Sequence, residues 1–349
     1  MSDGLRSVGS METAHVRRGL VRPVRLDPTG RAGPTRSQAR GSRWRRTSHG
    51  FYVPSHVDGD QPEQRILEAS VVVPRGSAIT GWAALRWLGG RWFTGVGADG
   101  ARLPVQVLIS SQDIRNQEGV VCCGEGCGPE HVMVVDGVRV TDPAWTVAFL
   151  MRRSSGVRRA VRAFDMAAYS DLVSEAEVRA VIDQQYAWTG VPQARDAVAL
   201  VSENSWSPKE TDFRITWTVV AGFPTPLANR PVFDVRGRHL ATPDLIDDRA
   251  GVVGEYDGPD HLDRAVRRSD LARDEILRSH GLEVVRTMAG DSVEDVVRRL
   301  RGAYDRASRR TDRRWTIALP PRWRSTHTVD LRRSLTVAER GRLLGYRAA

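Results

Sequence analysis

The chain contains very little lysine and cysteine, and it lacks a long apolar run. Among its 349 residues, 52 are lysine or arginine, Lys209 is the one lysine, and three are cysteine. No segment approaches the roughly 18 consecutive apolar residues of a membrane-spanning helix. The N-terminal residues have no apolar core typical of a secretory signal. We therefore expect a cytoplasmic protein without a membrane partner, and one with a packed core because 40% of the residues are hydrophobic.

Positive charge is concentrated at the two ends of the chain. Residues 1–50 hold 11 arginines against three acids, and residues 301–349 hold 13 arginines against four. Such arginine-rich ends attract phosphate groups, so DNA is the expected partner. The alternative is that these ends are simply solvated, with the arginine excess reflecting the base composition of the genome.

The cysteines gather in one short string. Cys122, Cys123 and Cys127 are followed by His131, which gives three thiols and an imidazole suited to tetrahedral zinc. The spacing matches no familiar zinc finger, and an ordinary loop between two strands is the favoured interpretation. An odd number of cysteines also argues against a disulfide framework.

The first 200 residues predict three parts. Residues 1–34 are rich in arginine, proline and glycine and predict a basic flexible arm. Residues 35–55 predict a short helix and a hairpin turning near His49–Gly50, the outline of a winged-helix tip in which Arg43, Arg45 and Arg46 contact DNA. The alternative is an arginine-rich loop before the first core strand. Residues 56–201 predict a small mixed α+β domain, with helices over 61–74 and 77–89, strands between 103 and 141, and helices over 143–153, 156–168, 174–185 and 192–201.

For residues 202–300 the sequence predicts a different order of elements: a helix, three strands, a second helix and a final strand. The first helix begins at Ser207 and Pro208, and the strands are expected over 230–235, 239–247 and 251–257. A long helix over 262–281 and a strand over 283–290 complete an α/β (mixed) unit. The remaining residues, 301–349, form an arginine- and tryptophan-rich tail. Its Trp315 and Trp323 either stack on nucleic-acid bases or, as the favoured interpretation, pack the tail against the body.

Three carboxylates fall on two of these strands. Asp244 lies on the second strand, and Glu255 and Asp257 lie two residues apart on the third, so their side chains share one face. Converging carboxylates repel one another unless a cation neutralises them. Oxygen ligands of this kind suit Mg²⁺ or Mn²⁺, which can activate water for phosphodiester hydrolysis.

The motifs over about residues 203–290 resemble those of the very-short-patch-repair-like endonuclease group of the PD-(D/E)xK nuclease superfamily. Pro243–Asp244 matches the "PD" element, and the string E-Y-D-G from Glu255 to Gly258 matches the group's E-x-D-G. The match continues through Asp270–Arg273 and Gly281–Arg286. The resemblance implies a restriction-endonuclease-like αβββαβ core in which Asp244, Glu255 and Asp257 hold the metal.

The catalytic lysine of the superfamily is replaced here by Asp257. The resemblance implies that a nearby histidine transfers the proton, and His261 is the candidate. Arg273 lies on the apolar stripe of the long helix, where it either pairs with a buried acid or binds the scissile phosphate. Glu210 is either an additional active-site acid or, as the favoured interpretation, the partner of Ser207 in a capping box.

The N-terminal two-thirds resembles the type IV abortive-infection (AbiEi-like) antitoxin family. The strings HGFYVP, SAITGWAAL and VDGVRVTDPAWTVAFL carry this likeness. The resemblance implies DNA binding through a winged helix, together with a cognate toxin or another protein partner. We therefore expect a metal-dependent DNA endonuclease or nickase, with a DNA-binding regulator that carries a catalytically silent nuclease-like domain as the alternative.

Overall fold

The computed structural model describes residues 17, 19–109, 114–258 and 273–347. The chain is mixed α/β with several sheets, and it divides into two compact units, residues 1–150 and 151–349. The helices over residues 157–198, which the sequence grouped with the residues before them, belong to the second unit.

A small three-stranded sheet opens the first unit. Strands β2 (Trp44–Ser48) and β3 (Phe51–Pro54) form the expected hairpin, and Gly50 turns it with a φ of +77°. Strand β1 (Val24–Arg25) pairs with β3, so two residues expected in a flexible arm extend the sheet. The expected short helix is a single 3₁₀ turn, η1 (Gln38–Arg40).

A five-stranded sheet holds the core of the first unit. Its order is β6-β5-β4-β8-β7, and its members are β4 (Ala78–Thr80), β5 (Val105–Leu108), β6 (Val120–Cys123), β7 (Val132–Val135) and β8 (Val138–Thr141). Helices α1 (Pro62–Ser70) and α2 (Gly81–Trp87) pack on it, and the turn η2 (Pro129–His131) precedes β7. The prediction of one helix over 77–89 is wrong at its start, because Ala78–Thr80 forms the central strand of the sheet and the helix begins at Gly81. Gly81 makes the sharp change with a φ of +66°, and a Cβ there would lie 1.9 Å from Gln106 Oε1.

A helical cluster leads into the second unit. It contains α3 (Pro143–Arg153), α4 (Val157–Tyr169), α5 (Glu175–Gln184) and α6 (Val191–Val198), close to the expected ranges. Ser174 and Glu177 form a capping box at the start of α5. Helix α7 (Pro208–Ile215) follows and continues into a π-helical turn, η3 (Thr216–Val220).

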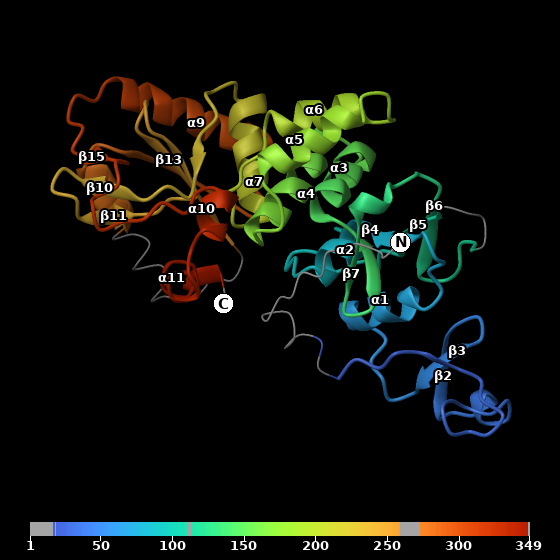
Figure 1. Cartoon of the computed structure of the whole chain (residues 1–349). Coiled ribbons are helices and arrows are strands. Elements are labelled where there is room, and N and C mark those ends of the chain that lie inside the picture. Colours follow the sequence, from blue (N-terminus) through green and yellow to red (C-terminus); the bar gives the residue numbers. More distant parts are fainter. Residues whose placement is uncertain (1–16, 18, 110–113, 259–272, 348–349) are drawn as a thin grey trace. The chain divides into compact units, whose positions relative to one another are not determined.

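The central sheet of the second unit, which contains β13 (Figure 1), has the order β14-β13-β12-β9. Strands β9 (Leu227–Ala228), β12 (Leu245–Asp247) and β13 (Val252–Asp257) are antiparallel neighbours, and β14 (Glu283–Met288) runs parallel to β13. Helix α7 and α9 (Val293–Ser308) pack on one face. Leu277, from the described helical residues 273–279, packs on the other face.

Two of the expected strands belong to a different sheet. Residues 230–235 yield β10 (Val232–Asp234), which pairs with β11 (His239–Ala241) and β15 (Trp315–Thr316) rather than with β12. The strand expected over 239–247 is interrupted at Thr242–Pro243, since proline has no N–H to donate to a ladder. Residues before the proline therefore pair in one sheet and residues after it in another.

The tail closes the second unit with short helices. These are α10 (Val329–Arg333), α11 (Val337–Leu343) and the turn η4 (Gly345–Arg347). Arg332 is fully buried and pairs with Asp171 at 2.5 Å, which ties the tail to the helical cluster. Trp315 is buried in the core, as packing of the tail predicts.

Candidate active site

Asp244 directly precedes β12 and lies opposite Glu255 on the neighbouring strand β13. Leu245 pairs with Gly254 in the antiparallel ladder, so one further step sets Asp244 against Glu255. Opposed residues in such a pair have Cβ atoms about 4.5–5.5 Å apart and share one face of the sheet. The backbone N–H of Tyr256 donates to Asp244 Oδ2 at 2.7 Å and fixes that carboxylate. The structure thus brings together two of the three expected metal ligands.

Burial makes this pair electrostatically costly. Glu255 is only 6% exposed. Burial and the charge of Asp244 raise the pKa of Glu255 to about 8. Burial also raises the pKa of Asp244 itself, although the Tyr256 N–H opposes the shift. Two neighbouring buried carboxyl groups therefore favour either a shared proton or a cation.

Glu210 belongs to the same electrostatic group. It lies in the first turn of α7, where Ser207 caps the helix by accepting from the Glu210 N–H at 3.2 Å. Its carboxylate accepts from the Trp206 N–H at 2.8 Å and from the Asn229 side chain at 2.7 Å. Burial and the charge of Asp244 raise the pKa of Glu210 to about 8. The Ser207 side chain caps the helix, but the expected reciprocal bond of the capping box is not formed, because the Glu210 carboxylate accepts from Trp206 and Asn229 instead.

Arg273 forms an ion pair with Glu255. Its guanidinium contacts Glu255 Oε1 and donates to the Thr242 carbonyl oxygen at 3.4 Å. The side chain is 35% exposed, and its Nε is a buried donor without an acceptor among the described residues. The expected buried ion pair is formed, and a donor remains for a further acceptor.

Asp257 is bound by an arginine instead of standing as a third ligand. Arg286, on the parallel strand β14, donates from one nitrogen to both oxygens of Asp257 at 2.7 and 2.9 Å. The same guanidinium donates to Asp274 at 2.8 and 3.0 Å. Arg286 lies beside Glu255 in the register of the two strands. The sequence motif that ends at Arg286 placed this residue near the site, but it did not indicate which acids Arg286 binds.

The residues fit a divalent cation through two carboxylates only. Asp244 and Glu255 offer the hard oxygen ligands that Mg²⁺ and Mn²⁺ prefer. Throughout the described ranges, no three His, Cys, Asp or Glu side chains are arranged to hold a metal ion. The expected three-carboxylate arrangement is therefore not formed, because both carboxylate oxygens of Asp257 accept hydrogen bonds from Arg286. His261 and Asp270 lie outside the described residues.

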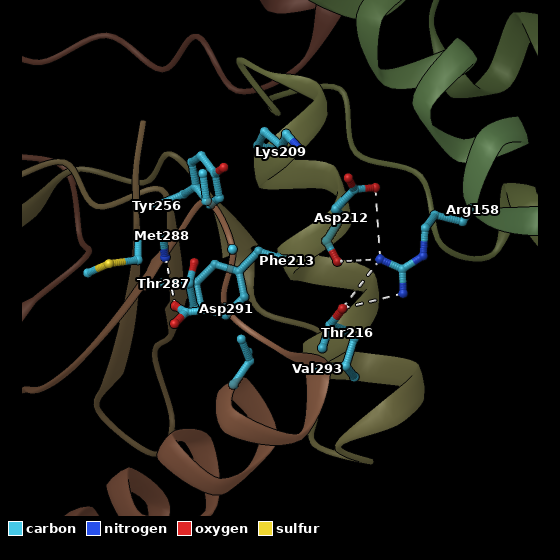
Figure 2. A pocket seen from close by; sticks show the side chains of 13 residues that line it. Arg158, Lys209, Asp212, Phe213, Thr216, Tyr256, Thr287, Met288, Asp291 and Val293 are labelled. Carbon is cyan, nitrogen blue, oxygen red and sulfur yellow. Dashed lines mark hydrogen bonds and ion pairs between the residues drawn. The ribbon is translucent and has the colours of Figure 1, made fainter. Parts of the chain in front are cut away.

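A cavity of about 190 Å³ lies behind the carboxylate pair, on the opposite face of the sheet. Tyr256 and Thr287 line it from β13 and β14, and Lys209 and Asp212 line it from α7 (Figure 2). Arg158 donates to the Asp212 carbonyl oxygen at 3.0 Å along one wall. Strand β13 thus carries Glu255 on one side and a cavity-lining tyrosine on the other.

The hairpin arginines of the first unit differ in their surroundings. Arg45 makes a two-point ion pair with Glu68 at 2.6 and 3.0 Å, and it is only partly exposed. Arg43 and Arg46 are exposed. Of the three expected DNA contacts, Arg43 and Arg46 keep surface guanidinium groups, whereas Arg45 fastens the hairpin to α1.

The conceivable zinc site is not formed. Cys122, Cys123 and Cys127 are free thiols, and none of the described residues makes a three-ligand metal cluster. His131 Nδ1 instead lies 2.7 Å from Asp142 Oδ2, while the other oxygen of Asp142 accepts from the Trp145 N–H and caps α3. Burial and nearby acids raise the pKa of Cys127 to about 12, which disfavours the thiolate that zinc requires.

Comparisons with known proteins add no family assignment. Protein-family models, curated proteins and solved structures all give no match to this chain. Within the described residues, every helix is too short or too polar to cross a bilayer.

Proposed function

We propose that residues 151–349 form a DNA endonuclease or nickase that hydrolyses phosphodiester bonds with Mg²⁺ or Mn²⁺. The opposed carboxylates of Asp244, which is half-buried, and Glu255, which is buried, carry this proposal. Their raised pKa values are typical of groups arranged for chemistry rather than for stability.

The topology of the second unit supports the finer proposal of a restriction-endonuclease-like core. Helix α7, three antiparallel strands, the helical residues 273–279 and the parallel strand β14 follow the order αβββαβ. The first strand is β9 rather than residues 230–235. The carboxylates lie on the second and third strands, as the resemblance implies.

Each residue near the pair has a definable role. Asp244 and Glu255 would hold the cation, which supplies charge stabilisation and lowers the pKa of an attacking water. Arg273, whose side chain is 35% exposed, would bind a non-bridging phosphate oxygen. Arg286 holds Asp257 and Asp274 in place. His261 remains the proposed proton acceptor.

Plasmid nicking tests this function. Wild type is compared with Glu255→Gln and Asp244→Asn, with and without Mg²⁺ or Mn²⁺. Asp248→Asn is the matched control, because Asp248 lies in the turn after β12. We expect metal-dependent nicking that falls by at least about 10²-fold in the two site variants and is unchanged in the control. Equal nicking by Glu255→Gln, or nicking that persists in EDTA, would contradict the proposal.

A DNA-binding regulator or antitoxin-like protein with a silent nuclease-like domain is the second candidate. The ion pairs of Arg273 with Glu255 and of Arg286 with Asp257 favour it, since they neutralise two acids without a cation. This function predicts duplex binding in EDTA and no cleavage by folded protein. A cognate toxin or another protein would then be its partner.

A further inference from the structure

Three aromatic side chains stack beside the carboxylate pair. Phe233 on β10 meets the Trp323 ring edge to face at 4.8 Å, and His239 on β11 stacks on Trp323 at 5.1 Å. Phe233 and His239 complete the triangle at 5.7 Å. We call these three residues the aromatic platform.

The aromatic platform is anchored at one end and open at the other. Phe233 is fully buried, whereas Trp323 is 42% exposed and His239 also reaches the surface. A buried ring beneath two exposed rings holds them in a defined orientation. Exposed aromatic rings held in this way are the means by which proteins stack on unpaired bases.

A short chain of contacts joins the aromatic platform to Glu255. His239 Nε2 lies 3.0 Å from Thr242 Oγ1, and the Thr242 carbonyl oxygen accepts from Arg273 at 3.4 Å. Arg273 in turn contacts Glu255. Burial and the charge of Arg273 lower the pKa of His239, although a backbone hydrogen bond with Ala241 opposes the shift.

Positive charge borders the aromatic platform. Arg322 precedes Trp323, and Arg236 lies in the turn between β10 and β11; both are exposed. In the part of the chain that the structure describes, neither guanidinium forms an ion pair with an acid. Exposed rings flanked by arginines complement a nucleic-acid strand, which presents flat bases between phosphates.

We infer that Trp323 and His239 bind an unpaired base of the nucleic-acid strand whose phosphate lies at Arg273. This inference rests on the proposed function and narrows its substrate to DNA with a single-stranded or unstacked nucleotide next to the cleaved bond. A fully paired duplex would leave the aromatic platform without a base to stack on.

Binding of a short single strand in EDTA tests the inference separately from cleavage. The probe is an oligothymidylate of about ten nucleotides with one central 2-aminopurine, whose fluorescence falls when it stacks. The variants are Trp323→Ala, Trp323→Phe and the control Trp92→Ala, because Trp92 is 41% exposed and Trp323 is 42% exposed. Circular dichroism of each variant checks that it is folded.

We expect Trp323→Ala to weaken binding by about 5- to 150-fold and to abolish the 2-aminopurine quenching, while Trp323→Phe retains most of both. Trp92→Ala should match wild type. Unchanged binding and quenching by folded Trp323→Ala would overturn the inference. If wild type does not nick DNA but the Trp323 variants still change oligothymidylate binding as expected, the proposed activity is overturned and the stacking site is retained.

Discussion

The backbone N–H of Asn229 donates to the carbonyl oxygen of Asp244 at 2.9 Å. The same residue donates from its side chain to Glu210 at 2.7 Å and to the Asn204 carbonyl oxygen at 2.8 Å. Asn229 has a φ of +48° and is 3% exposed, and its Oδ1 is a buried acceptor without a described donor. One residue in a left-handed conformation therefore connects two of the buried acids.

We expect Asn229→Ala to destabilise the protein by about 2–4 kcal/mol, since it strains the backbone and removes two buried hydrogen bonds. Urea unfolding measures the change. Asn229→Gly relieves the strain but not the loss of the side chain, so it should fall between wild type and Asn229→Ala. Equal stability of Asn229→Ala and wild type would show that the side-chain contacts contribute nothing.

Arg286→Lys should cost about 3 kcal/mol, although it keeps the charge. A lysine ammonium cannot reproduce the planar fork that binds Asp257 and Asp274 together, so one buried acid loses its partner. Thermal or urea unfolding measures the loss. Arg298→Lys is the control, because Arg298 pairs with Asp295 on an exposed face of α9 and should change stability little.

Stability should fall as the pH drops from about 6.5 to 4, in part through His327. Burial and the charges of Arg230 and Arg332 lower the pKa of His327 to about 4. Between these values the unfolded chain binds a proton that the folded chain does not, so acid favours unfolding. His327→Gln should remove at most about 3 kcal/mol of this dependence. If the free energy of unfolding depends on pH in the same way for wild type and His327→Gln between about pH 6.5 and 4, His327 makes no contribution to the acid sensitivity.

Duplex binding should separate the hairpin arginines. We expect Arg43→Ala and Arg46→Ala to weaken binding and to reduce its salt dependence, because their exposed guanidinium groups can reach phosphates. Arg45→Ala should act mainly on stability, since it removes the partner of Glu68. A mobility-shift assay at two salt concentrations, with unfolding curves for each variant, distinguishes the two effects. Equal salt slopes for Arg46→Ala and wild type would remove Arg46 from the interface.

The sequence predicted local structure better than strand pairing. Helix caps depend on neighbouring residues, so α7 begins as expected at Pro208, with Ser207 as its cap. Glu255 and Asp257 lie on the same face of the sheet because side chains two residues apart in a strand point in the same direction. Strand partners depend on distant residues, and residues 230–235 pair with β15, some 80 positions later, which no local pattern indicates.

The site was predicted in part for the same reason. Carboxylate positions could be identified from motifs, and Asp244 and Glu255 meet as expected. The partner of Asp257 could not be identified, because Arg286 reaches it only through the parallel pairing of β13 with β14. Asn229 carried no signal in the sequence, since its role depends on a left-handed backbone and on two remote acids.

The proline that interrupts the strand at Thr242–Pro243 has one more consequence. Only five peptide units separate His239 from Asp244, so their Cα atoms can be at most about 18 Å apart. The exposed imidazole of His239 and the carboxylate of Asp244 therefore belong to one short segment of chain. We expect the emission of Trp323, which stacks on His239, to change when a cation or a phosphate binds at the carboxylate pair.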